Sequence, residues 1–72
     1  MLGKYNVVIE YLDKKGDVFD SHDLLFTDYE DEATKFAEEV ELTEPNTQVA
    51  IWEWDDDEDY IVVSWIVKEY ER

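Results

Sequence analysis

The sequence contains no cysteine, one proline, two glycines and one histidine in 72 residues. The absence of cysteine excludes a disulfide framework and a cysteine-based zinc site. The sequence also lacks any apolar run of the roughly 18 residues that a membrane-spanning helix needs. We therefore expect a single domain over residues 1–72 that is cytoplasmic and makes no membrane contact.

Basic residues are scarce as well. Six Lys and Arg stand against 21 Asp and Glu, which gives a formal net charge of −15. This balance argues against direct binding to nucleic acid, because phosphate contacts require Lys and Arg. A net charge of about 2–8 in magnitude keeps a small domain soluble, so the surplus favours a functional field that attracts cationic partners. Solvated charge runs and adaptation to high salt are the other interpretations.

The sequence is rich in apolar and aromatic residues. Hydrophobic residues make up 44% and aromatic residues 15%, which is the opposite of a disordered acidic tail. We therefore expect a folded domain with a thin margin of stability. In a chain below about 70–80 residues one core rarely contributes more than about 3–5 kcal/mol, so self-association or a partner is a common source of further burial.

Alternating β-branched and aromatic residues predict four strands and one helix in the order ββαββ. A turn at residues 13–17 includes Gly16, and the second strand is expected at a sheet edge because neither of its faces is uniformly apolar. We expect an α+β domain with a four-stranded, mostly antiparallel sheet and one amphipathic helix on one face. The predicted strands are residues 4–12, 18–26, 47–54 and 60–70.

The helix has the clearest pattern in the sequence. Thr27 followed three residues later by Glu30 fits a capping box. Pro45 ends the helical region. The apolar residues that recur at helical spacing are Tyr29, Ala33, Phe36, Ala37 and Val40.

One helix can cover only one face of the sheet, yet the first, third and fourth strands carry large apolar residues on both faces. If Val49, Ile51, Ile61, Val63 and Trp65 lie toward the helix, then Trp52, Trp54, Val62 and Ile66 are left on the open face. The opposite facing of either strand leaves a similar excess of apolar residues. An exposed apolar surface of that size is typical of an interface. The alternative is a curled sheet whose open face is half covered by Tyr rings and Lys stems.

Two acidic segments are expected at one end of the sheet, provided that the helix runs antiparallel to the second strand. The residues of this group are Asp28, Glu30, Asp31, Glu32, Asp55, Asp56, Asp57, Glu58 and Asp59. A second group, tempered by Lys14 and Lys15, is expected at the other end: Asp13, Asp17, Glu39, Glu41 and Glu44. We expect the first group to bind a partner together with Trp52 and Trp54, which suit cation–π contact with arginine.

We expect no enzyme, no cofactor and no dedicated metal site. An EF-hand loop starting at Asp55 needs Gly at its sixth position and Glu at its twelfth, where the sequence has Tyr60 and Ile66. His22 lies between a serine and an aspartate, but neighbours on a strand point to opposite faces. A tryptophan platform for nucleic-acid bases comes with a basic groove, which this chain lacks.

Because it is small, cysteine-free, strongly acidic and of mixed α/β character, the chain resembles the DNA-mimic and host-takeover proteins of bacteriophages. These include uracil-DNA glycosylase inhibitors, anti-restriction proteins and anti-CRISPR proteins. Glycosylase inhibitors carry a Glu-Ser-Ile/Val-like element on an edge strand, and the nearest equivalent here is Asp20-Ser21-His22. The resemblance implies a protein that sequesters a DNA-repair or defence enzyme by occupying its DNA-binding surface, in the host cytoplasm.

Two functions from different classes remain open at this point. The first is an inhibitory module that binds a basic nucleic-acid-binding protein. The second is a non-inhibitory, homo-oligomeric accessory or structural protein whose tryptophan-bearing sheet face is the subunit interface, with a homodimer as the expected assembly. Salt separates them, because exposed charges are screened beyond about 8–10 Å at ordinary ionic strength. A charge-driven complex weakens as salt rises, whereas apolar self-association persists.

Overall fold

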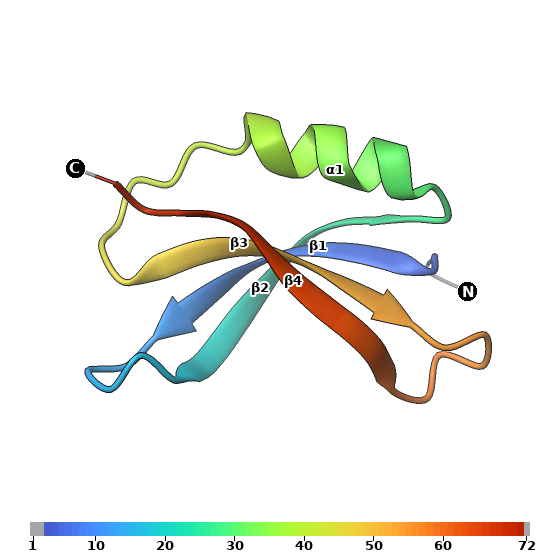
Figure 1. Cartoon of the computed structure of the whole chain (residues 1–72), viewed down its shortest axis with the longest axis horizontal. Coiled ribbons are helices and arrows are strands. Elements are labelled where there is room, and N and C mark those ends of the chain that lie inside the picture. The colour runs from blue at the N-terminus through green and yellow to red at the C-terminus, as the bar shows by residue number, and fades with distance from the viewer. Residues whose placement is uncertain (1–2, 72) are drawn as a thin grey trace.

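A computed structural model describes residues 3–71 of the chain. Within this range the chain forms β1 (Tyr5–Leu12), β2 (Val18–Thr27), α1 (Glu30–Glu39), β3 (Thr47–Trp54) and β4 (Ile61–Glu69). The strands make one antiparallel sheet in the order β2-β1-β3-β4, and α1 lies across one face (Figure 1). The predicted α+β domain with ββαββ order is therefore confirmed over the described residues.

The core lies between α1 and the central strands β1 and β3. Val7, Val49 and Ile51 are fully buried there, and they meet Ala33 and Ala37 of the helix. The small alanine side chains allow the helix backbone to lie close to the sheet. Burial of Val49 and Ile51 under the helix decides between the two facings that the sequence allowed for β3.

β2 lies at one edge of the sheet, as predicted, and a bulge explains its mixed faces. Val7 pairs with Leu25, but the next residue Val8 pairs with Asp23, so Leu24 is an extra residue in the strand. A bulge of this kind shifts the alternation by one residue. Leu24 and Leu25 consequently both pack against the core.

β4 forms the other edge and contains two register shifts. Val62 and Val67 are passed over in the pairing with β3, and Ile61 is the partner of Trp54. Directly paired residues point to the same face, so Ile61 lies on the face away from α1. The prediction that Ile61 faces the helix was wrong, because simple alternation does not include the bulge. Trp65 packs against the core, as predicted.

α1 begins at Glu30, without the predicted capping box. Its N-cap is Tyr29, whose side chain makes no capping hydrogen bond within the described part of the chain. Thr27 is the last residue of β2, where it pairs with Tyr5. Its Oγ1 accepts a hydrogen bond from the backbone N of Tyr29 (3.2 Å), so it supports the turn before the helix instead of capping it.

The last turn of α1 carries no basic residue, and the sheet supplies a cation in its place. Lys68 Nζ of β4 donates a hydrogen bond to the main-chain oxygen of Glu38 (2.9 Å). A positive charge at the C-terminal end of a helix stabilises it by about 0.3–1 kcal/mol. This contact ties the edge strand β4 to the helix.

Candidate binding site at the acidic end

The start of α1 and the β3–β4 loop lie at the same end of the sheet, where α1 runs antiparallel to β2 (Figure 1). Both are tied to the start of β1. The backbone N of Lys4 donates to Asp28 Oδ1 (3.1 Å), and its carbonyl accepts from the backbone N of Trp54 (2.8 Å). The Tyr5 hydroxyl donates to Glu30 Oε1 (3.4 Å). The predicted gathering of the two acidic segments is confirmed.

We call this region the acidic end, defined by Asp28, Glu30, Asp31, Glu32, Asp55, Asp56, Asp57, Glu58 and Asp59. Asp55 and Glu58 are half-buried, and the other members are exposed to solvent. The exposed carboxylates come from both segments. A partner that approaches this end therefore meets charges from the helix and from the loop together.

Lys4 brings one positive charge to the acidic end. Its Nζ lies 3.6 Å from Glu53 Oε2, and this is the one ion pair recorded within residues 3–71. Lys14 and Lys15 belong to the β1–β2 turn, which lies at the opposite end of the sheet (Figure 1), and Lys68 donates a hydrogen bond to Glu38 near the C-terminal end of α1. These three lysines therefore do not neutralise the carboxylates of the acidic end.

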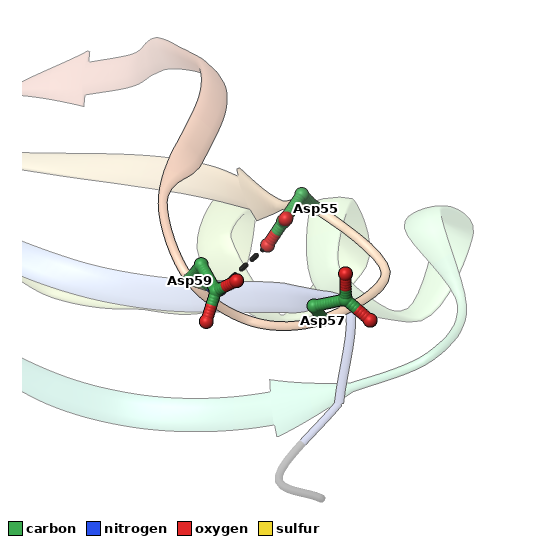
Figure 2. Close-up of side chains that lie close together, drawn as sticks. All are labelled: Asp55, Asp57 and Asp59. Atoms are coloured by element: carbon green, nitrogen blue, oxygen red, sulfur yellow. Dashed lines mark hydrogen bonds between the residues drawn. The ribbon is translucent and has the colours of Figure 1, made fainter.

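The β3–β4 loop is folded around Asp55 (Figure 2). Its Oδ1 accepts hydrogen bonds from the backbone N of Asp59 (2.6 Å) and of Tyr60 (3.4 Å). Its carbonyl accepts from the backbone N of Glu58 (3.0 Å), which has a φ of 60°. One carboxylate oxygen from each of Asp55, Asp57 and Asp59 lies within 4.8 Å of the others. These side chains are placed to share a cation, but exposed acidic groups often gather without one.

The negative charge of this region acts on Tyr5. Burial raises the pKa of the Tyr5 phenol, and the carboxylates of Glu53 and Glu30 raise it further because they disfavour the phenolate. Lys4 acts in the opposite direction. The pKa of Tyr5 therefore responds to the negative charge at the acidic end.

A pocket of about 340 Å³ opens at the acidic end, on the sheet face away from α1. Its aromatic walls are Phe26 of β2 and Trp52 and Trp54 of β3. The two indole centroids are 6.3 Å apart, and the rings meet at 66°, an edge-to-face arrangement. The polar side chains that line the pocket are Asn6, Ser21, Asp23 and Glu58.

Trp52 is held in place by the buried carboxylate of Glu10, which is 8% exposed. Glu10 Oε2 accepts a hydrogen bond from Trp52 Nε1 (2.9 Å), and Oε1 accepts from Gln48 Nε2 (2.7 Å). Sequence analysis assigned no role to Glu10. The signal that could have found it is an acidic residue inside an otherwise apolar, central strand, where a charge needs partners.

The open face is less exposed than the sequence predicted. Trp52 and Trp54 are half-buried, whereas Val62 and Ile66 are 55% and 53% exposed. Ile61, the partner of Trp54 on this face, and Tyr60 just before it are exposed as well, whereas the exposed Val63 pairs with Glu53 on the face that carries α1. The apolar surface is therefore centred on the edge strand β4, not on the tryptophans.

The Asp20-Ser21-His22 segment lies in the edge strand β2, as expected. Asp20 and His22 pair with Tyr11 and Ile9, on the face of the sheet that carries α1. Ser21 points to the other face and lines the pocket. The segment thus contributes a single side chain to the candidate site.

Comparison with protein-family models, with curated proteins and with solved structures finds no match for this chain. Within residues 3–71, no helix is long and apolar enough to cross a membrane. The assignment of the site therefore rests on the charge, the burial and the contacts described above.

Proposed function

We propose that this chain is an acidic binding protein that occupies the basic nucleic-acid-binding surface of a target protein, as DNA-mimic inhibitors do. The acidic end carries the proposal, because two segments distant in sequence present exposed carboxylates on one framework. A concentrated negative field attracts grooves lined by Lys and Arg. The proposed action involves no catalysis and no cofactor, and takes place in the cytoplasm, which is the host's if a phage encodes the chain.

The spacing and the rigidity of the carboxylates support the proposal. Three carboxylate oxygens of the β3–β4 loop lie within 4.8 Å of one another, so the loop concentrates negative charge, as the phosphate backbone of DNA does. The hydrogen bonds to Asp55 hold the loop in one arrangement. A partner therefore loses less binding free energy to the ordering of side chains and loops.

The test begins with the immobilised full chain and a bacterial lysate, at about 50 mM and about 500 mM salt. We expect nucleic-acid-binding proteins to be captured at low salt and released at high salt. Each captured protein is then purified, and its affinity for duplex DNA is measured with and without the acidic chain. The expected result is inhibition that competes with DNA. Captured proteins that bind DNA equally well in the presence of the chain would contradict the proposal.

Two matched variants distinguish the effect of charge at the acidic end from the effect of the net charge of the whole chain. The first neutralises three exposed loop acids, Asp56→Asn, Asp57→Asn and Asp59→Asn, and keeps Asp55 because it folds the loop. The second, Glu39→Gln, Glu41→Gln and Glu44→Gln, removes the same charge from the opposite end. We expect the first to weaken binding to a captured partner by about tenfold and the second by about twofold or less. Equal losses would show that position does not matter.

Self-association is a second candidate function, favoured by the apolar exposure of β4. Val62 and Ile66 are more than half exposed on a strand at the sheet edge. The outward backbone groups of an edge strand can pair with a strand from another chain. This candidate places the subunit interface along β4, and not over Trp52 and Trp54 as the sequence suggested.

Sedimentation at several protein concentrations tests this second candidate. Val62→Lys is expected to shift a dimer to monomer, because it puts a charge into the apolar strand. Val18→Lys is the matched control, since Val18 is 46% exposed on the other edge strand. A wild-type chain that sediments as a monomer at high concentration rejects self-association.

A further inference from the structure

We infer that the pocket formed by Phe26, Trp52 and Trp54 receives an arginine side chain from the partner protein. The inference rests on the proposed function and deepens it, because it names the chemical group that enters a specific place on the surface. It goes beyond a general attraction between opposite charges. The pocket predicts one anchoring residue with defined geometry.

The aromatic walls fit a guanidinium group. Planar guanidinium ions stack on indole faces and interact with their negative π-surface. Both indoles line the pocket, and they meet each other edge to face. Trp52 is fixed by its hydrogen bond to Glu10 (2.9 Å). This wall is therefore in position before a ligand arrives.

The charge of the pocket also fits a cation. Asp23 and Glu58 line it, and the described lining residues include no Lys or Arg. Glu58 Oε2 is buried without a hydrogen-bond partner among residues 3–71. A buried carboxylate oxygen without a donor is unfavourable, and a guanidinium N–H supplies that donor once the Glu58 side chain turns this oxygen into the pocket. Glu58 also adopts a φ of 60°, a backbone conformation uncommon for glutamate and concentrated at functional sites.

A second unpartnered group points to an arginine within a peptide. Trp54 Nε1 is buried and has no acceptor in the described part of the chain. A metal ion or a quaternary ammonium ion brings no acceptor for this N–H. An arginine residue in a peptide supplies both missing partners: its guanidinium N–H groups are donors for Glu58, and its main-chain carbonyl is an acceptor for Trp54. The pocket volume of about 340 Å³ leaves room for one long side chain.

The test is an NMR titration of the isotopically labelled full chain with acetyl-Gly-Arg-Gly-amide, followed at the indole N–H signals. The matched probe replaces arginine by citrulline, which has nearly the same shape and no charge. We expect the arginine peptide to shift the Trp54 indole signal in a saturable manner. The citrulline peptide is expected to bind at least about tenfold more weakly. Equal affinities for the two peptides would overturn the inference.

Two variants test the contact with Glu58. Glu58→Gln is expected to lower the affinity for the arginine peptide by about fivefold or more. Asp57→Asn removes an exposed acid of the same loop and is expected to lower that affinity by about twofold or less. Equal losses mean that the loop attracts cations only in general, and they overturn the pocket assignment. If Glu58→Gln alters the spectrum of the free loop, Asp23→Asn serves as the pocket variant under the same criterion.

The two proposals fail separately. Arginine binding at Trp54 without capture of any nucleic-acid-binding protein supports the pocket and rejects the proposed function. Capture of DNA-binding proteins that the chain inhibits, without a shift at Trp54 by the arginine peptide, supports the proposed function and overturns the pocket.

Discussion

The two faces of the sheet bury residues of the same central strands, β1 and β3, in different ways. Toward α1, Val7, Val49 and Ile51 are buried by contact with Ala33 and Ala37. This is an apolar interface between a helix and a sheet, and its stability comes from the removal of hydrocarbon surface from water. For this interface the sequence pattern predicted both elements, the helix stripe with Ala33 and Ala37 and the strand face with Val49 and Ile51.

The face away from α1 buries Val8 and Ala50 just as completely. Polar side chains accompany them. Asn6 is 1% exposed, and its Nδ2 donates to the carbonyl of Leu25 (3.2 Å), while Glu10 accepts the two hydrogen bonds described above. Buried polar groups are tolerated because they are hydrogen-bonded.

A small domain can therefore cover the second face of a sheet with its own side chains. The strands of this sheet cross at a strong twist (Figure 1), which is the usual right-handed twist of β-structure. We infer that the twist brings long side chains over the centre of the open face. The helix-covered face buries more apolar side chains, whereas the polar face sets the position of the aromatic pocket.

The largest effect is expected from truncation on the helix-covered face. Ile51→Ala is expected to lower the free energy of unfolding by about 2–5 kcal/mol, because it removes buried hydrocarbon and leaves a cavity. Urea denaturation followed by tryptophan emission measures it. The control is Ile66→Ala on the exposed part of β4, with an expected loss below about 1 kcal/mol. Equal losses would mean that the helix interface is not the main core.

A smaller loss is expected when the polar network of the open face is cut. Glu10→Ala leaves Gln48 Nε2 and Trp52 Nε1 without their acceptor, and each unpaired donor costs about 1–3 kcal/mol. Glu10→Gln keeps the size and one acceptor oxygen, so its loss is expected to be smaller. Urea denaturation gives the stability, and the Trp52 indole N–H shift reports the bond. If Glu10→Ala is no worse than Glu41→Ala, the network does not contribute.

The contact between β4 and the helix end is expected to contribute least to stability. Lys68→Met keeps much of the side-chain length and removes the charge, so the expected loss is about 0.3–1 kcal/mol. Lys35→Met on the exposed side of α1 removes the same charge without that contact. The difference between the two variants isolates the interaction with Glu38. No difference would assign the whole effect to net charge.

The pH dependence of the helix-covered face is expected to follow Tyr5. Its pKa is higher in the folded chain than the ordinary value of 10.0, so the folded state holds the proton more tightly than the unfolded state. The associated stability is complete below that ordinary value and is lost as the pH rises through the raised pKa. Glu30→Gln is expected to lower the pKa of Tyr5, measured by tyrosinate absorbance. An unchanged titration would remove Glu30 as a cause; Asp57→Asn is the control.

Much of the fold could be predicted because its signals are local. The bounds of β3 were predicted to the residue, since a polar turn precedes it and acids follow it, and its alternation is regular. The direction of the chain through the predicted elements was enough to predict that the two acidic segments lie at the same end of the sheet. The predicted capping box does not form because Thr27 belongs to β2, where pairing with Tyr5 outweighs the local preference for a helix cap.

The features that could not be predicted depend on contacts distant in sequence. The bulge at Leu24 is visible only when β2 is aligned against β1. The bonds from Gln48 and Trp52 to Glu10 span 38 and 42 residues. The pocket combines side chains from β1, β2, β3 and the β3–β4 loop. Local periodicity contains no information on which of these side chains meet.

Because of the strand order, β1 lacks one of its two neighbouring strands for much of the time in which the chain is synthesised. β1 is made first, yet it lies inside the sheet, and its residue Tyr5 pairs with Glu53 near the end of β3. Pairing over such a separation is slow, since a long loop must close first. Until β3 emerges from the ribosome, the β1–β2 hairpin leaves one apolar strand without its neighbour. Strong mutual repulsion between nascent chains would then protect that strand from premature aggregation.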